Sequence, residues 1–410
     1  MPHETPLLAT VAAAFGLAFV FGYLAARIRL QPLVGYLLAG IVVGPFTPGY
    51  VADVPIAAEL AEIGVILLMF GVGLHFSPRD LLAVKRIAIP GALVQIAAAS
   101  LMTAFAEHLY GWTWSAGLVF GFSLSVASTV VLLRALEQRG IVQSEDGRIA
   151  IGWLIVEDLV TVFILVLLPA LAPAAGEGAV AATRGPIVAV FLALVKAAVF
   201  LGLMLFAGRR AIPKLLSSVA NMGSRELFTL AVVALALGIA VGAAMLFGVS
   251  FALGAFFAGV IIGESDVSHR AAADALPLQD AFAVLFFVSV GMLFNPRILV
   301  DRPVEVLIAV LIIIVGKSLA AFGIVRALRY PMRTALVVSA GLSQIGELSF
   351  ILIALAVSLK LVPAEGRDLV LAGALVSITL NPLIFGLAER LLQRATSERS
   401  SVGQTGTIGK

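Results

Sequence analysis

The chain has 410 residues, of which 61% are hydrophobic and 12% charged, with a formal net charge of +3 and a mean hydropathy of +1.10. This composition is far more apolar than a soluble domain requires and predicts an integral membrane protein. The absence of cysteine excludes disulfides, thiol nucleophiles, iron–sulfur clusters and cysteine-ligated zinc.

A transmembrane helix needs roughly 20 apolar residues, and on that measure we predict thirteen spans. In chain order they cover about residues 6–26, 32–46, 56–76, 87–107, 113–136, 148–170, 186–207, 226–246, 249–263, 279–295, 303–326, 332–357 and 367–389. The second, ninth and tenth are short. Residues 391–410 are polar, and we expect a disordered cytoplasmic tail there.

The basic residues predict which side of the membrane each loop faces. An odd number of spans places the two termini on opposite sides. Loops after odd-numbered spans, together with the tail, contain 20 of the 27 lysines and arginines. The positive-inside rule therefore predicts a cytoplasmic C-terminus and an external, periplasmic N-terminus. Because topology accounts for the basic balance, we expect no nucleic-acid partner.

Two stretches of the sequence recur at nearly one spacing. Residues 68–81 align with 286–299 at an offset of 218, and residues 35–44 align with 254–263 at an offset of 219. The matches pair spans that are seven apart, and an odd separation reverses their direction, which predicts an inverted-topology repeat. Such repeats are typical of secondary transporters, whose ion site lies near the membrane midplane. General similarity of glycine-rich apolar helices is the alternative explanation.

This repeat divides the predicted transmembrane domain, residues 1–390. Repeat one covers about 6–170, a linking helix about 186–207, and repeat two about 226–389. The same offset sets the polar run 123–129 over 341–347. Serine, threonine and glycine weaken helices, so we predict two crossed discontinuous helices around a cavity. Ordinary packing of small residues would also explain 123–129 taken alone.

Charged residues inside the spans indicate the chemistry. Glu157 and Asp158 lie nine residues or more beyond cytoplasmic Arg148, about 14 Å along the helix, and Lys317 lies equally deep from Arg326. Ionisable groups at this depth are costly and mark ion or proton pathways. A carboxylate can hold either a cation or a proton, so we assign Asp158 as the carrier of H⁺ and of K⁺ or Na⁺. Glu157 is then the charge partner of Lys317.

Further polar residues are candidates for the same site. Neutral oxygen ligands are expected from Ser125, Ser128, Thr129, Ser343 and Gln344. Glu347 is expected either to cap the broken helix or to titrate, and Glu62 either to line an entry path or to cap a helix. Asn381-Pro382 is expected to kink the last span. The alternative to an ion site is a structural cluster of Glu157, Asp158 and Lys317.

Enzyme and channel signatures are missing from the sequence. It has no HExxH, GxGxxG or GxSxG motif and no TVGYG filter. An intramembrane aspartyl protease needs two aspartates on separate helices, whereas only Asp158 lies deep in a span. We therefore expect neither an enzyme nor a cofactor in this chain, and the only ligands are the transported cation and proton.

Several stretches together resemble the Kef-type monovalent cation:proton antiporters, most closely their YbaL branch. These are residues 32–40, 61–70, the serine-rich run to Thr129, residues 156–159 and residues 341–347. The resemblance covers essentially residues 1–390. It implies an NhaA/NapA-like antiporter fold in a homodimer of the bacterial inner membrane, with elevator-like movement and a preference for K⁺ over Na⁺.

The resemblance also carries residue roles. By similarity, Asp158 matches the ion-binding aspartate and Lys317 the core lysine, whereas relatives more often have glutamine where this chain has Glu157. Such relatives commonly continue into a cytosolic nucleotide-binding regulatory domain, which we expect to lie outside these 410 residues. The predicted function is monovalent cation:proton antiport by alternating access. A gated cation channel and a non-transporting membrane sensor remain the alternatives.

Overall fold

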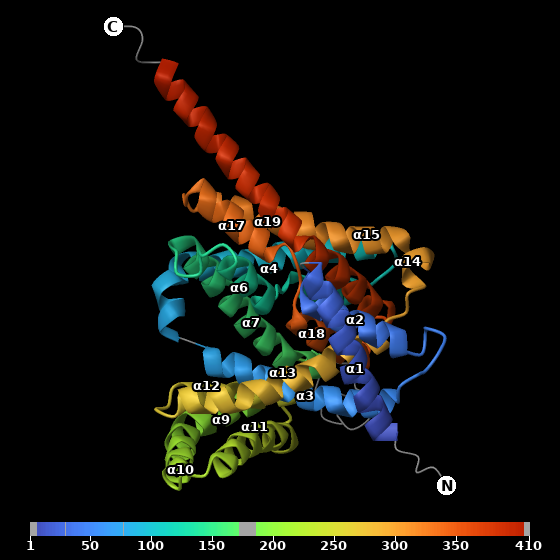
Figure 1. Cartoon of the computed structure of the whole chain (residues 1–410), viewed down its shortest axis with the longest axis vertical. Coiled ribbons are helices and arrows are strands. Elements are labelled where there is room, and N and C mark those ends of the chain that lie inside the picture. The colour runs from blue at the N-terminus through green and yellow to red at the C-terminus, as the bar shows by residue number, and fades with distance from the viewer. Residues whose placement is uncertain (1–5, 29, 77, 172–185, 406–410) are drawn as a thin grey trace. The chain divides into compact units, whose positions relative to one another are not determined.

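The computed structural model describes residues 6–28, 30–76, 78–171 and 186–405, and the regular structure in these ranges is entirely helical (Figure 1). Within them, nine helices are long and apolar enough to cross a membrane, or ten if the bent pair α17 (Met332–Leu342) and α18 (Glu347–Ser358) forms one span. The prediction of an all-α, multi-pass membrane protein is confirmed. The count of thirteen stays a prediction, since α2 (Pro32–Val43) and α12 (Phe251–Gly263) are shorter apolar helices.

The helices fall into two compact units. Unit 1 comprises Met1–Ser77, Val160–Pro296 and Leu355–Leu361, and unit 2 comprises Pro78–Leu159, Arg297–Ala354 and Val362–Lys410. In unit 1, the helices besides α2 and α12 are α1 (Pro6–Arg27), α3 (Val54–His75), α9 (Pro186–Leu203), the π-helical turn η1 (Met204–Gly208), α10 (Arg209–Asn221), α11 (Arg225–Phe247) and α13 (Ser268–Met292).

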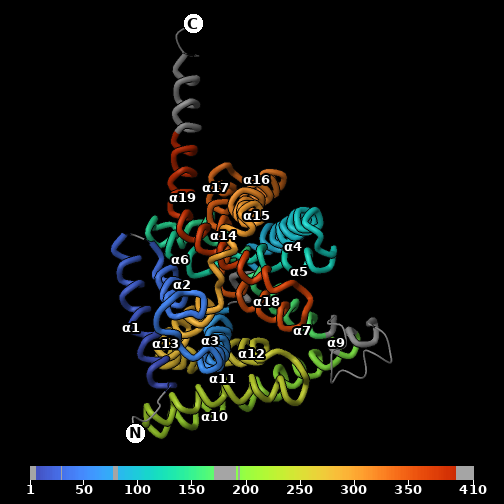
Figure 2. Tube along the Cα trace, turned by 90° about the vertical axis from the view of Figure 1, so that its right-hand side faces the viewer, coloured from blue at the N-terminus to red at the C-terminus, as the bar shows by residue number. Residues whose placement is uncertain are grey.

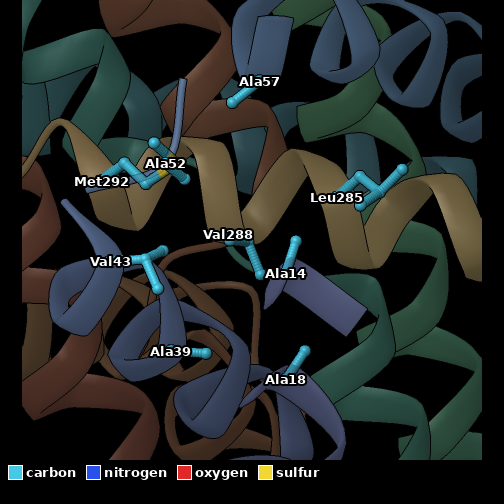
Figure 3. Close-up of a cluster of buried hydrophobic side chains, with 9 residues drawn as sticks. All are labelled: Ala14, Ala18, Ala39, Val43, Ala52, Ala57, Leu285, Val288 and Met292. Atoms are coloured by element: carbon cyan, nitrogen blue, oxygen red, sulfur yellow. The ribbon is translucent and has the colours of Figure 1, made fainter. Parts of the chain in front are cut away.

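The core of unit 1 is built from small and branched side chains of four helices. Helices α1, α2 and α13 lie side by side, with α3 against α13 (Figure 2). Figure 3 shows the buried cluster that they share, made of Ala14, Ala18, Ala39, Val43, Ala52, Ala57, Leu285, Val288 and Met292. Alanines on α1 and α2 allow the helices to approach closely, which is the usual way that apolar helices pack in membranes.

Glycines allow two helix crossings in unit 1 that match residue by residue. A Cβ on Gly40 of α2 would meet the Val288 carbonyl and lie 2.8 Å from the Gly291 Cα. A Cβ on Gly259 of α12 would meet the Phe70 carbonyl and lie 3.0 Å from the Gly73 Cα. The two sets of residues are related by the offsets of 218 and 219 found in the sequence. The α2–α13 and α3–α12 pairs are therefore built alike.

Unit 2 contains both interrupted helices. Its elements are α4 (Pro78–Leu109), α5 (Trp114–Ser125), α6 (Thr129–Glu137), the first part of α7 (Glu145–Leu171), α14 (Ile298–Asp301), α15 (Pro303–Leu311), the π-helical turn η2 (Ile312–Gly316), α16 (Lys317–Ala327), α17, most of α18, and α19 (Glu365–Thr405). Helix α5 ends three residues before α6 begins, and α17 and α18 meet at 47°. Both interruptions lie where the polar runs predicted them.

The C-terminal segment differs from the expectation of a disordered tail. Helix α19 continues to Thr405, and residues 406–410 lie outside the described residues. The physical reason is local composition, because Leu391–Arg399 consists mostly of residues that favour helix and contains neither glycine nor proline. The last span and the start of the tail are therefore one helix.

The glycine crossings generate a stability prediction. We expect Gly40→Ala and Gly259→Ala each to lower the free energy of unfolding by about 1–3 kcal/mol, because the added methyl group would have to displace backbone atoms. Gly16→Ala is the matched control, since no heavy atom lies within 4 Å of a Cβ there. Denaturant unfolding in detergent would measure all three. Equal stabilities for Gly40→Ala and Gly16→Ala would contradict the close approach.

Candidate ion-binding site

Two breaks in unit 2 expose backbone groups that a continuous helix would pair. Break 1 comprises Val126–Ser128 and break 2 comprises Ser343–Gly346. Val126 adopts an extended backbone with φ −86° and ψ 125°, which ends α5. Ser128 then starts α6, because its Oγ accepts a hydrogen bond from the Val131 N–H at 3.3 Å. Local serine chemistry thus stops one half-helix and begins the next.

The two breaks bond to each other. The Gln344 side chain accepts from the Ser128 N–H at 3.1 Å and donates to the Ser128 carbonyl at 3.1 Å. The Gly346 N–H and the Ser349 hydroxyl both donate to the Val126 carbonyl, at 3.3 and 3.2 Å. A Cβ on Gly346 would lie 2.6 Å from the Ser128 Cα, so glycine is required for this contact. The prediction that the two polar runs meet is supported by these bonds.

The two adjacent acids of α7, Glu157 and Asp158, both lie at break 1 but differ in burial and in hydrogen-bond partner. Glu157 is fully buried, and its Oε2 accepts a hydrogen bond from the Ala127 N–H at 2.9 Å. Asp158 is only partly buried, and its Oδ2 accepts from the Thr129 hydroxyl at 3.2 Å. Neighbouring helical residues point about 100° apart, so the two carboxylates reach different parts of the break. Glu157 bonds to the backbone of break 1, whereas Asp158 is partly exposed and bonds to a side chain.

Lys317 donates a hydrogen bond to the backbone of break 2. It is the first residue of α16, directly after the π-helical turn η2, and its fully buried Nζ donates to the Gln344 carbonyl at 2.9 Å. Such π-helical turns are frequent at functional sites. Lys317 also lies close enough to Glu157 for their charges to interact. The ammonium group therefore stands at the carboxyl end of a half-helix and Glu157 at an amino end, as the helix dipoles favour.

Glu347 adds a third acid. It lies in the first turn of α18 and accepts a hydrogen bond from the Ser128 hydroxyl at 3.1 Å. Its charge also interacts with that of Asp158. Three carboxyl groups and one amine consequently share this region of unit 2. If all four were ionised, the carboxylates would outnumber the amine, so the site favours an added proton or cation.

The remaining predicted ligands take different positions. The hydroxyls of Ser125 and Ser343 donate to carbonyls of their own helices, Phe122 at 2.8 Å and Ala340 at 2.7 Å. Donating a hydrogen leaves oxygen lone pairs for a cation, so these two remain candidates. Glu62 is exposed on α3 and belongs to unit 1, so it is not among the side chains that unit 2 gathers.

Two buried amides that support the breaks escaped the sequence reasoning. Gln95 of α4 donates from Nε2 to the Ser125 carbonyl at 3.2 Å. Asn381 of α19 donates from Nδ2 to the Ala340 carbonyl at 2.9 Å and to the Ser343 hydroxyl at 3.0 Å. At Asn381-Pro382 the sequence indicated only a kink. The available signal was an amide side chain within an apolar span, since a buried amide needs hydrogen-bond partners.

Comparisons with known proteins agree with this architecture. The family model described as "Sodium/hydrogen exchanger, transmembrane" matches residues 15–388. YbaL of Escherichia coli (strain K12), named as a cation/proton antiporter, is 58% identical over 395 residues, which is 96% of this chain and 70% of YbaL. The K(+) efflux antiporter 4 of Arabidopsis thaliana is 33% identical over 362 residues, which is 87% of this chain and 60% of that protein.

A solved structure has a similar fold. The sodium proton antiporter MjNhaP1 of Methanocaldococcus jannaschii, at pH 8, superposes with a TM-score of 0.65 over 94% of this chain and 98% of the other, at 15% identity. At that identity the likeness concerns the fold alone. Together with the family match and the antiporter relatives, it confirms the resemblance to cation:proton antiporters that the motifs predicted.

The double role of Ser128 gives a prediction. Ser128→Ala removes an N-cap, which costs about 0.5–2 kcal/mol, and also leaves the buried Glu347 carboxyl without its hydroxyl donor. Ser224 is the matched control, because it caps α11 through the Leu227 N–H at 3.2 Å and bonds to no carboxylate among the described contacts. In denaturant unfolding we expect Ser128→Ala to lose about 1–3 kcal/mol more than Ser224→Ala. Equal losses would refute the second role.

Proposed function

The chain belongs to the sodium/hydrogen exchanger family of transmembrane proteins, and from this we propose that it is a monovalent cation:proton antiporter whose ions bind at Asp158. The observation that carries the proposal is the unequal environment of two adjacent acids. Glu157 is fully buried and held by a backbone N–H, whereas Asp158 is partly accessible and held by one hydroxyl among the described contacts. Asp158 is therefore the acid that is free to exchange its ligand.

The exchange follows from competition at one carboxylate. In the proton-loaded state the Asp158 carboxyl is neutral, and loss of the proton leaves an anion that a cation can neutralise. Thr129 lies within hydrogen-bonding distance of Asp158 and supplies a neutral oxygen, with Ser125, Ser128, Ser343 and Gln344 as further candidate donors. Because one carboxylate cannot hold both species, binding of the cation is linked to release of the proton.

Glu157 and Lys317 have a supporting role in this proposal. The charge of Lys317 compensates that of Glu157, so the ionisable pair keeps break 1 and break 2 together while Asp158 exchanges ions. Glu347 is assigned to the support of Ser128. Glu157 is compensated by the amine and Glu347 is bonded to the Ser128 hydroxyl, so Asp158 is the carboxylate assigned to the transported ions.

We further propose alternating access through an inverted repeat of about 6–170 and 226–389, joined by a linking helix at about 186–207. The matched glycine crossings in unit 1 and the matched breaks in unit 2, both at offsets of 218 to 219, support this division. An elevator-like movement, a homodimer and a bacterial inner-membrane location with an external N-terminus belong to the same proposal. They rest on the family resemblance and on the distribution of basic residues.

Potassium is proposed as the preferred cation, with sodium as the competitor. The support is similarity to plant proteins named as K(+) efflux antiporters, at 33% identity. The K(+) efflux antiporters extend beyond the matched region, since the chain covers 60% and 59% of their lengths. Regulation by a cytosolic nucleotide-binding domain is therefore not assigned to the residues of this chain.

The carrier assignment is tested by proton flux in proteoliposomes with imposed potassium, sodium or lithium gradients. We expect Asp158→Asn to reduce exchange to the rate of protein-free liposomes, because an amide cannot take up and release a proton. Glu157→Gln is expected to keep exchange while changing the charge moved per cation. The matched control is Glu226→Gln, which alters an exposed acid at the start of α11 in unit 1.

Several outcomes would contradict the proposal. If the Asp158→Asn variant exchanged ions at the wild-type rate, Asp158 would not be the carrier. Single-channel steps, or flux far above the roughly 1–10³ turnovers per second of typical catalysts, would favour a gated channel. Absence of cation-dependent proton movement in the wild type at every pH would favour a membrane sensor.

A further inference from the structure

Gln95 is a buried amide that the proposed exchange reaction does not use. It lies in α4 with no exposed surface, and its Nε2 donates to the Ser125 carbonyl, the last carbonyl of α5, at 3.2 Å. That bond fixes the orientation of the amide, because only the nitrogen can donate. The Gln95 Oε1 has no hydrogen-bond partner among the described residues. A buried acceptor without a donor costs about 1–3 kcal/mol, so the side chain is retained despite a penalty.

Helix α4, which carries Gln95, packs against α7, which carries the acidic pair. A Cβ on Gly152 of α7 would lie 3.7 Å from the Ala88 Cβ, and a Cβ on Gly91 of α4 would meet the Trp153 ring. One helical turn further along each helix, Gly91 leads to Gln95 and Trp153 leads to Glu157. Gln95 bonds to residue 125 and Glu157 bonds to residue 127, so the two side chains contact the segment at break 1 two residues apart.

Break 2 has a corresponding arrangement. Lys317 on α16 donates to the Gln344 carbonyl at 2.9 Å, as Gln95 on α4 donates to the Ser125 carbonyl. The offset of 218 places Ser125 over Ser343, next to Gln344, and α4 over the segment that contains α16. Each break is thus supported by one buried nitrogen donor from a corresponding helix. The donor at break 2 is charged, and the donor at break 1 is neutral.

Every residue of the segment 125–129 is tied to a neighbouring helix. The carbonyls of residues 125 and 126 are held from α4 and α18, the N–H groups of residues 127 and 128 bond to Glu157 and Gln344, and the hydroxyl of residue 129 bonds to Asp158. Gln95 makes the first of these ties and the ion-binding acid receives the last. The segment spans only five residues, and the backbones of residues 126 and 128 between its ends are extended.

We propose that Gln95 is a positioning residue of the ion site: it fixes the Ser125 carbonyl, and through the segment 125–129 it sets where Thr129 and Asp158 meet the cation. The expected effect of Gln95 on ion transport rests on the proposed function. Its effect on the position of the segment 125–129 does not. A neutral donor suits this place, because a second ammonium group at break 1 would repel the incoming cation.

The structural part is tested by amide hydrogen exchange of the peptide that covers residues 125–129. We expect Gln95→Met, which keeps the volume and removes the donor, to speed the exchange of the Ala127 and Ser128 amides about tenfold. The matched control is Thr103→Val, also fully buried in α4, whose one hydroxyl bond among the described residues goes to the Ala99 carbonyl of its own helix at 2.8 Å. If Gln95→Met does not fold, Gln95→Asn withdraws the amide by about 1.5 Å and tests the same bond.

The transport part is tested in proteoliposomes with the same variants. For Gln95→Met we expect the cation concentration at half-maximal exchange to rise about five- to tenfold, the usual effect of one lost hydrogen bond. The maximal rate is expected to change less than about twofold, because Asp158 itself remains. Thr103→Val is expected to match the wild type in both parameters.

Two results would overturn the proposal. The first is wild-type amide exchange in segment 125–129 of a folded Gln95→Met or Gln95→Asn protein. The second is a loss of unfolding stability equal to that of Thr103→Val without any change in half-maximal cation concentration, which would indicate a purely structural role. If the wild type transports no cation, the proposed function fails, and the amide exchange result still decides whether Gln95 fixes the segment.

Discussion

The satisfaction of backbone groups at the two breaks is the constraint on which the rest of the structure depends. In an apolar environment an interrupted helix must find protein or water partners for every freed N–H and carbonyl. Here the partners come largely from side chains, among them Gln344 between the breaks and Glu157 from α7. Because these side chains are fixed by their backbone bonds, the polar groups around them are fixed as well. The geometry of the proposed ion site therefore arises from the requirement to stabilise interrupted helices.

Charge is distributed over these bonds in a consistent way. Lys317 meets a carbonyl at the end of α17, and Glu157 meets an N–H at the start of α6, so each charge faces the half-helix end of opposite polarity. Asp158 has no backbone bond among the described contacts and shares only a hydroxyl with Thr129. One acid of the pair is thus committed to structure and the other is available to ligands. Adjacent residues of the same type acquire different tasks from their partners alone.

The sequence was sufficient for features that depend on composition and spacing. Hydropathy indicated the long apolar helices and the offset of 218 indicated both breaks. Charges at depth indicated Asp158 and Lys317, whose roles in ion binding stay a proposal. It was insufficient for features that depend on which atoms meet. Gln95 carries no charge, and nothing in its spacing reveals that its partner is the Ser125 carbonyl. Glu62 was expected to line an entry path or to cap a helix; it is exposed in unit 1, and both roles stay predictions.

Helix α19 connects the proposed ion site to a distant part of unit 2. Asn381 holds the end of α17, and from that residue the same helix continues to Thr405, roughly 36 Å further on. A continuous helix such as α19 transmits rotation about its axis, whereas an unstructured chain does not. A ligand bound to the last turns of α19 would therefore change the position of break 2 through the bonds of Asn381.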